Sequence, residues 1–404
     1  MERIELSQEH TGRRGVLALL LLALGVGLLT YAIVGLTSVE TGWQTIEVNT
    51  SAGPTCGDDF SLLYQVGSRT ESREVTSLYS DACKKAYQMF HSDQEFDGAV
   101  NIRTINSRPN EVLEVDAGLY EALAAIAASG RRELYLGPVY ERYDDLFYCQ
   151  DDGQLADFDP RLSEAVAEEY AGVLAFANDP QAIRLELLDG NRVRLCVSDG
   201  YLAWAEREGV GKFIDFSWMR NAFIADYIAG ELAAGGYTAG VLNSYDGFTR
   251  NLDGRGVDYT YPLCARRGDT IYTPADLHYR GPMSLVRMRD YPLSQLDLRQ
   301  YYELENREIR TLYLDTADAL CKSAVDTLLC YSAEKGCGQL LLEMIPVYIA
   351  DRFREEAIPA LAEEGTQSIY CQGGVVRYTD PDAVLEDLLQ QDDVRYTAEQ
   401  IRAS

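Results

Sequence analysis

The chain has 404 residues, which is enough for one large domain or two modest ones. Its hydrophobic share of 47% is that of an ordinary globular protein, but its formal net charge is −28 at pH 7. A protein this acidic repels phosphate backbones, so we predict that it has no nucleic-acid partner. It contains only three histidines, and His10 precedes a membrane-type segment, so a multi-histidine metal site is excluded.

The first predicted element is an apolar stretch near the N-terminus. Gly15 to Leu36 contains no charged residue and is long enough to cross the ~30 Å hydrocarbon core of a bilayer as a helix. Arg13 and Arg14 precede it, and positive flanks of this kind stay in the cytoplasm. We therefore predict a short cytoplasmic N-terminus (1–14), one transmembrane helix (15–37) and an extracytoplasmic main domain. A cleaved signal peptide is the alternative, and it exports the domain as well.

The cysteines all follow this apolar segment. In an oxidising compartment eight of the nine could pair, but the odd number and the lack of a C-x-x-C motif leave buried free thiols as an equal alternative. The positions are Cys56, Cys83, Cys149, Cys196, Cys264, Cys321, Cys330, Cys337 and Cys371.

The first half of the exported part mixes strands and helices. Residues 38–57 are polar, contain Gly53-Pro54 and are predicted to form a stalk. In the stretch that starts at Asp116, Leu119, Leu123 and Ile126 recur at helical spacing before Gly130. The full set of expected elements is a strand over 59–66, a helix over 77–90, an extended piece over 102–106, a helix over 116–127, an acidic loop over 148–160 and a hairpin over 183–197.

The second half opens on a stretch that reads as strand, helix and strand. An apolar run ends in Asp215, an amphipathic helix follows, and Gly235-Gly236 ends it before an extended run over 239–243. Beyond that we expect helices over 317–331 and 337–356, a strand over 375–378 and an acidic C-terminal tail over 381–404. Strands and helices do not alternate regularly, so we predict one α+β domain over 58–380.

Familiar catalytic motifs are missing from the sequence. It has no G-x-G-x-x-G, Walker A, G-x-S-x-G or H-E-x-x-H. Ser323 and Thr327, with Asp326 beside them, would share one face of the predicted helix over 317–331. Such oxygen ligands could meet one Mg²⁺, although Ser and Thr in a helix more often bond to their own backbone.

The order of these pieces resembles the ApbE family of FAD:protein FMN transferases. "IRTIN" at 102–106 is similar to the family's S-x-I-x-x-(I/L)-N run, and residues 115–127 and 137–146 are similar to the helix and the G-P-L-x-x-L-W piece that follow it. Residues 215–226 align without a gap with the motif D-L-G-G-I-A-K-G-Y-A-x-D. Farther along, "NSYDG" stands at the family's N-x-G-G-D, and "KSAVDT" stands at its A-D-A-x-x-T.

The resemblance implies a fold, a reaction and a set of site residues. The fold would be a single large ApbE-like domain, related to the T-fold, behind one transmembrane helix. The reaction would be Mg²⁺-dependent transfer of FMN from FAD to a Ser or Thr of a partner flavoprotein at the membrane. The cofactor-binding positions would be Asp215, Ser217, Asn221, Asn243 and Asp246, and the metal-binding positions would be Ser323, Asp326 and Thr327.

Several residues differ from the family pattern. Ser217 and Trp218 replace two glycines, Asn221 replaces a lysine, and Ser323 replaces a metal-bound aspartate. Residues 301–305 replace an H-H-I-x-D-P run. Three hypotheses follow: an active but divergent FMN transferase, an inactive ApbE-like protein that serves as a binding or scaffolding domain, or an unrelated extracytoplasmic domain.

Overall fold

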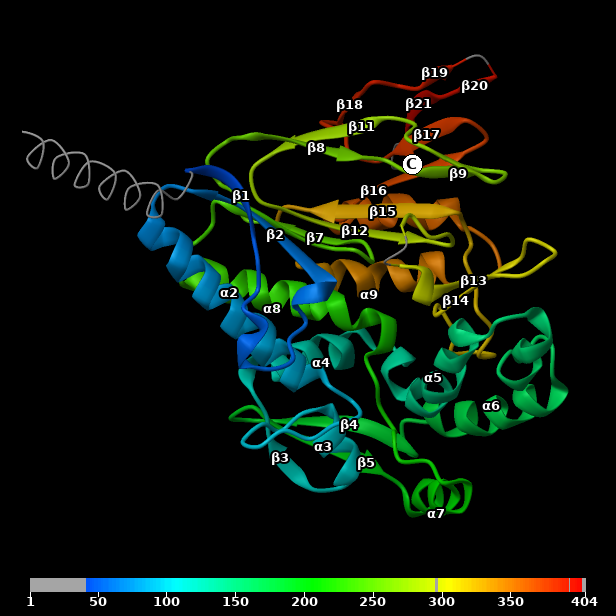
Figure 1. The fold of residues 1–404 in the computed structure, drawn as a ribbon. Coiled ribbons are helices and arrows are strands. Elements are labelled where there is room, and N and C mark those ends of the chain that lie inside the picture. Colours follow the sequence, from blue (N-terminus) through cyan, green and yellow to red (C-terminus); the bar gives the residue numbers. More distant parts are fainter. Residues whose placement is uncertain (1–40, 295–296, 392, 402–404) are drawn as a thin grey trace, which may run out of the picture.

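The computed structural model describes residues 41–294, 297–391 and 393–401. Its centre is a nine-stranded sheet, antiparallel except for the pairing of its last two strands (Figure 1). In spatial order the strands are β1 (Gly42–Ile46), β2 (Phe60–Val66), β6 (Gly240–Ser244), β7 (Phe248–Asn251), β12 (Met283–Arg289), β15 (Thr327–Ser332), β16 (Gln367–Gln372), β17 (Val375–Tyr378) and β21 (Thr397–Gln400).

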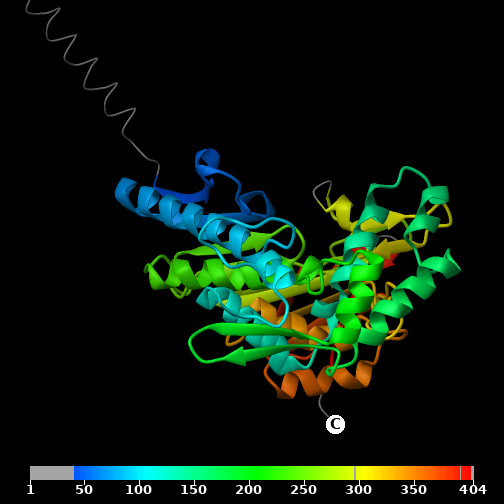
Figure 2. The same cartoon turned by 90° about the horizontal axis from the view of Figure 1, so that it is seen from below.

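Helices cover one face of this sheet, as Figures 1 and 2 show from two directions. They are α2 (Arg69–Phe90), α8 (Arg220–Ala234) and α9 (Cys337–Tyr348). The side chain of Ser68 accepts a hydrogen bond from the amide of Glu71 and so caps the start of α2. Asp226 of α8 accepts the amides of Cys337 and Gly338, each at 2.8 Å, and so fixes the start of α9. Capping thus joins two of the covering helices to each other.

Shorter strands cover the opposite face. They are β8 (Asp258–Pro262), β11 (Asp276–Arg280) and β18 (Val384–Glu386) in one sheet, and β9 (Ala265–Arg267) and β10 (Thr270–Tyr272) in another. A second apolar cluster, which includes Leu277, Leu285 and Ile369, lies between these strands and the main sheet. The main sheet is therefore buried on both faces.

The remaining elements form two groups along the chain. The first group lies in the sequence between β2 and α8, and the second lies in the segments that connect the later strands of the main sheet. The first group is α3 (Ile102–Ser107), β3 (Val112–Glu114), α4 (Ala117–Ser129), α5 (Gly137–Tyr143), α6 (Glu164–Ala177), β4 (Ile183–Leu188), β5 (Arg192–Val197) and α7 (Asp199–Glu208). The second is β13 (Tyr301–Glu303), β14 (Ile309–Thr311), α10 (Ile358–Glu363), β19 (Gln390–Gln391) and β20 (Val394–Arg395).

Elements with strong local signals agree with the sequence predictions. The predicted hairpin over 183–197 is the β4–β5 pair. Asp116 caps α4 by accepting the amide of Gly118, and Gly130 ends that helix in the left-handed region at φ 68°. The helix α8 and the strands β6 and β17 also lie where the sequence predicts them.

The predictions of a separate stalk and a separate C-terminal tail are wrong, because both segments contribute strands to the domain. Gly42–Ile46 of the stalk is the edge strand β1, and Gly53-Pro54 belongs to the connection between β1 and β2. In the tail, β18 pairs with β11, and β21 pairs with β17. The apolar residues of the tail face the second cluster, and this burial overrides their weak helical spacing.

Three predicted elements have the wrong type. Residues 102–106 are helical, because the Asn101 side chain caps them through the amide of Thr104. The apolar run over 213–215 is not a strand, and the helix predicted over 317–331 is a loop followed by β15. Every residue of β15 is buried, and a strand buried on both faces gives a continuous apolar run that resembles a buried helix. The helix predicted over 337–356 ends at Tyr348.

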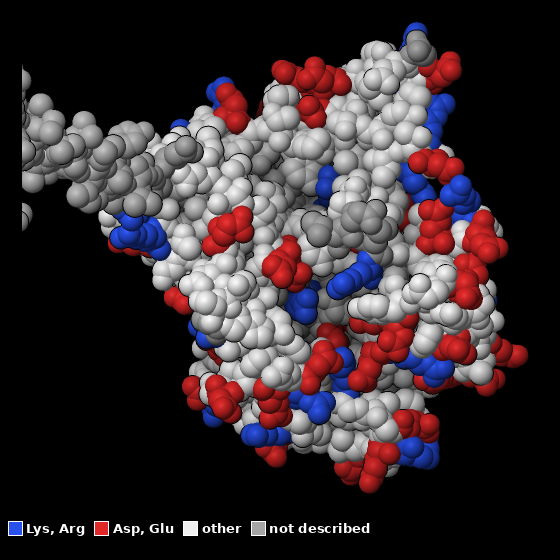
Figure 3. All heavy atoms as spheres, viewed as in Figure 1, with Lys and Arg blue, Asp and Glu red and all other residues white. Residues whose placement is uncertain are grey.

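The predicted membrane segment (15–37) and the predicted cytoplasmic end (1–14) lie outside the described residues. Within the described part, no helix combines the length and the apolar character that a membrane span needs. Figure 3 shows Asp and Glu spread over the visible face, with Lys and Arg in smaller groups. The negative charge is therefore distributed over this face and is not confined to one site.

Candidate functional site

The turn that precedes α8 is held by a side chain instead of a strand partner. The Asn106 amide oxygen accepts the backbone amides of Phe213 and Ile214 at 3.0 and 2.9 Å, and its nitrogen donates to the Ile214 carbonyl at 2.8 Å. Asp215, one of the predicted cofactor residues, accepts the amide of Ser217 at 2.8 Å and lies 3.4 Å from the Lys212 ammonium. Asp215 therefore has a defined local role in shaping this turn.

Ser217 retains the backbone conformation of a glycine. Its φ is 44°, in the left-handed region that glycine adopts readily and other residues adopt at a cost. The resemblance places a glycine of the motif at this position, and a glycine would adopt this φ without strain. The alignment of residues 215–226 stays a prediction.

Trp218 fills the space that the second glycine would leave open. Its side chain is buried, its indole N–H donates to the Tyr140 hydroxyl at 3.3 Å, and its ring packs edge to face on Tyr313 with centroids 5.0 Å apart. The cavity that remains beside it, which Asp246 and Phe248 also line, measures about 10 Å³. That volume holds about one water molecule, so a flavin ring does not fit there.

Asn221 and Asp246 form a buried pair below this turn. The Asn221 amide donates to the Asp246 carboxylate at 2.9 Å, and the two residues are 4% and 7% exposed. Burial raises the pKa of Asp246 to about 6, against its hydrogen bonds to Ser244 and Asn221. The other predicted residue of this group, Asn243, accepts a hydrogen bond from the Thr249 hydroxyl instead. Because an amide replaces the family's lysine, Asp246 bonds to a neutral partner.

The residues predicted to bind a metal do not form the expected helical face. Ser323 and Asp326 lie in the loop before β15, and Thr327 is the first residue of that strand. The Thr327 hydroxyl is hydrogen-bonded to the Tyr291 hydroxyl at 2.6 Å. Within the described ranges, no group of three or more His, Cys, Asp or Glu residues is placed to hold a metal ion. The donor set at this position therefore does not fit a Mg²⁺ site of the expected kind.

A lysine in the same loop holds three carboxylates together. The Lys322 ammonium lies 2.8 Å from Asp315, 2.7 Å from Asp318 and 2.9 Å from Asp351, and its side chain is 7% exposed. These carboxylates keep the pKa of Lys322 raised although burial opposes its charge. The sequence contains a signal for this cluster that the alignment at 322–327 did not use, because "ADA" also occurs at 317–319, three residues before Lys322.

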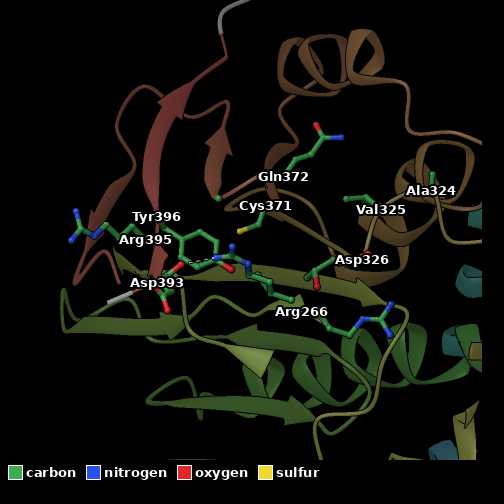
Figure 4. Close-up of a pocket in the computed structure, with 14 residues that line it drawn as sticks. Arg266, Ala324, Val325, Asp326, Cys371, Gln372, Asp393, Arg395 and Tyr396 are labelled. Atoms are coloured by element: carbon green, nitrogen blue, oxygen red, sulfur yellow. Dashed lines mark hydrogen bonds between the residues drawn. The ribbon is translucent and has the colours of Figure 1, made fainter. Parts of the chain in front are cut away.

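A large cavity of about 650 Å³ lies on the other side of this loop (Figure 4). Asp326 and Arg266 line one side, Tyr396 and Asp393 of the C-terminal segment line the other, and Cys371 lies between the two sides. The lining residues are Ala265, Arg266, Arg267, Ala324, Val325, Asp326, Thr327, Cys371, Gln372, Gly373, Gly374, Asp393, Arg395 and Tyr396. The cavity lies within the range of small-molecule sites, and the predicted C-terminal tail supplies part of its wall.

A second hollow has a volume of about 330 Å³ and is lined in part by Ser323. Arg266 lines both this hollow and the large cavity. Arg266 lies 3.2 Å from Asp290, whose amide donates to the Asp326 carbonyl at 3.0 Å. The pKa of Asp290 is raised to about 7, mainly by burial; Arg266 lowers this pKa, and the Asp326 charge raises it. The structure therefore separates the predicted site residues into a closed group around Trp218 and an open group around Asp326.

Comparison with known proteins supports the fold. No protein-family model matches the chain, and no curated protein matches it either. Among solved structures, the ApbE protein from Thermotoga maritima superposes with a TM-score of 0.56 at 14% identity and covers 82% of this chain and 94% of its own. A point mutant of the flavin transferase ApbE from Vibrio cholerae has a TM-score of 0.52 at 14% identity and covers 86% and 97%. The predicted α+β, ApbE-like fold is thereby confirmed.

Proposed function

We propose that this chain is an ApbE-like binding or scaffolding domain that does not transfer FMN at the position that the resemblance assigns. The observation that carries the proposal is the filled space beside Trp218, where about 10 Å³ remains. Pockets for small ligands usually measure about 300–1,000 Å³. Tyr140 and Tyr313 hold the indole in place by a hydrogen bond and a ring contact, so the closure is part of the packed core.

The surroundings of Thr327 and Lys322 support the same proposal. Metal-assisted phosphoryl chemistry relies on a cation that neutralises developing negative charge. Here Thr327 is bonded to Tyr291, and the loop carries a lysine ammonium among three carboxylates. An FMN transferase in this chain would have to hold its cation with other residues.

The proposed location and partner rest on the sequence alone. We propose a single-pass membrane protein whose N-terminus is cytoplasmic and whose main domain is extracytoplasmic, because residues 15–36 carry no charge. The partner would be a protein at the membrane and not a nucleic acid, because the chain carries a net charge of −28.

An active, divergent FMN transferase is the second candidate. It is favoured by the large cavity, because Asp326 and Thr327 line it together with Arg266 and Arg267. Guanidinium groups recognise phosphate, and one carboxylate with substrate phosphates is a usual set of Mg²⁺ ligands. On this reading FAD would lie in that cavity, and a flavoprotein would accept the FMN.

FAD binding by the full chain in detergent, with and without Mg²⁺, tests the two candidates. Flavin fluorescence reports binding, and AMP release reports cleavage of FAD. We expect neither signal at high micromolar FAD. Mg²⁺-dependent binding with AMP release would establish the transferase instead. In that case Arg266→Gln should weaken binding if FAD lies in the large cavity, whereas Trp218→Phe should leave binding unchanged.

A further inference from the structure

Cys56 and Cys83 are both free cysteines, and they are in contact although they are 27 positions apart in the sequence. The Cys56 thiol donates to the Cys83 carbonyl at 3.2 Å, and the Cys56 amide lies 3.4 Å from the same oxygen. Cys83 is on the buried face of α2, and Cys56 is in the connection between β1 and β2, which runs beside α2 (Figure 1). Two segments of the fold therefore meet at this pair.

The surroundings of the pair do not suit a reactive thiol. Cys56 is 4% exposed and Cys83 is fully buried. The Cys83 side chain and burial together raise the pKa of the Cys56 thiol well above its ordinary value. Arg220 lowers this pKa, but it is the smallest of the influences on the group. A nucleophilic or metal-binding cysteine needs an accessible thiolate, so neither role fits these two residues.

We propose that Cys56 and Cys83 form a disulfide bond when the domain is exported, and that this bond ties the β1–β2 connection to α2. The bond forms while the chain folds, before burial closes off the two thiols: together they lose two protons and two electrons to a disulfide-containing oxidant, which is reduced to its dithiol through a mixed disulfide. The bond would stabilise the domain next to β1, the first described strand after the predicted membrane segment. This proposal does not depend on whether the chain transfers FMN.

The other cysteines have different neighbours. Cys330 contacts the Ser368 hydroxyl at 3.3 Å, and Cys337 donates to the Thr249 carbonyl at 3.4 Å. Burial raises the pKa of the Cys371 thiol, and the nearby Cys264 raises it further. We therefore expect a disulfide bond between Cys56 and Cys83 in preference to a bond between other cysteines.

Peptide mapping of the purified full chain tests the proposal. The chain is unfolded, reduced and refolded in a buffer of oxidised and reduced glutathione, free thiols are then blocked without reduction, and the digest is searched for linked peptides. We expect a peptide that joins Cys56 to Cys83. Free Cys56 and Cys83 in the folded chain, or a bond from either residue to another cysteine, would overturn the proposal.

Thermal unfolding gives a second readout. A reductant should lower the Tm of the oxidised wild type by about 3–8 °C, because the open chain regains conformational freedom when unfolded. The double variant Cys56→Ser/Cys83→Ser should fold and show no such change on reduction. Cys149→Ser, at a partly exposed position, is the matched control and should keep the full shift. A shift that persists in the double variant would contradict the assignment.

Discussion

The guanidinium of Arg289 and the carboxylate of Asp297 form an ion pair that is buried from water, with side chains 0% and 1% exposed. Arg289 also donates to the carbonyls of Tyr291 at 3.0 Å and Tyr245 at 3.5 Å. Tyr245 adjoins Asp246 of the closed group, and Tyr291 holds Thr327 of the open group. One arginine thus connects the two halves into which the predicted site has separated.

This pair should carry a large share of the stability of the region. Removing one partner leaves a buried, unpaired charge, so we expect Asp297→Asn to lower the free energy of unfolding by about 3–5 kcal/mol. Urea denaturation measures the change. The exposed pair Arg280–Asp258 is the matched control, and Asp258→Asn should have no measurable effect. Equal losses in the two variants would contradict the assigned role of Arg289.

Ser217 is strained at φ 44°, and a glycine should relieve that strain. We expect Ser217→Gly to raise the free energy of unfolding by about 1 kcal/mol, since the left-handed region costs a residue with a Cβ about 1–2 kcal/mol and glycine loses more entropy on folding. The control Ser217→Ala keeps the Cβ and should bring no gain. If alanine stabilises the chain as much as glycine does, backbone strain is not the cause.

The ionisation of Asp246 should lower the free energy of unfolding as the pH rises. Its pKa is raised from 3.8 to about 6 in the folded chain, so the folded state binds more protons than the unfolded state between these values. The stabilisation from the neutral carboxyl is complete below about pH 4 and is lost as the pH passes 6. Over this range the wild type should lose about 2–3 kcal/mol relative to Asp246→Asn. Parallel stability curves for the two proteins would rule this out.

Lys322 should be needed to hold Asp315, Asp318 and Asp351 together. We expect Lys322→Ala to lower the free energy of unfolding by about 1–3 kcal/mol, because three carboxylates then repel one another around a vacated space. Carboxylate oxygens are the ligands that Ca²⁺ prefers, so millimolar Ca²⁺ should raise the Tm of this variant but not that of the wild type. Lys322→Arg keeps the charge and is the control. A Ca²⁺ response in the control would argue against this explanation.

The sequence by itself determined the elements whose signals are local. The helix α4 has its cap at Asp116 and its stop at Gly130, and the β4–β5 hairpin has its turn between two alternating runs. Local spacing also carried the resemblance at 215–226, and the likeness to solved ApbE structures supports the fold that it implies. These features could be predicted because the residues that set them are neighbours in the chain.

Only the tertiary structure decided the state of the site. Trp218 meets Tyr140 across 78 positions, Thr327 meets Tyr291 across 36, and Asn106 holds Ile214 across 108. In each contact, a distant side chain occupies a residue for which the sequence predicted a ligand, a metal or a strand partner. No local pattern encodes such contacts, because they depend on which distant side chains the folded core brings together.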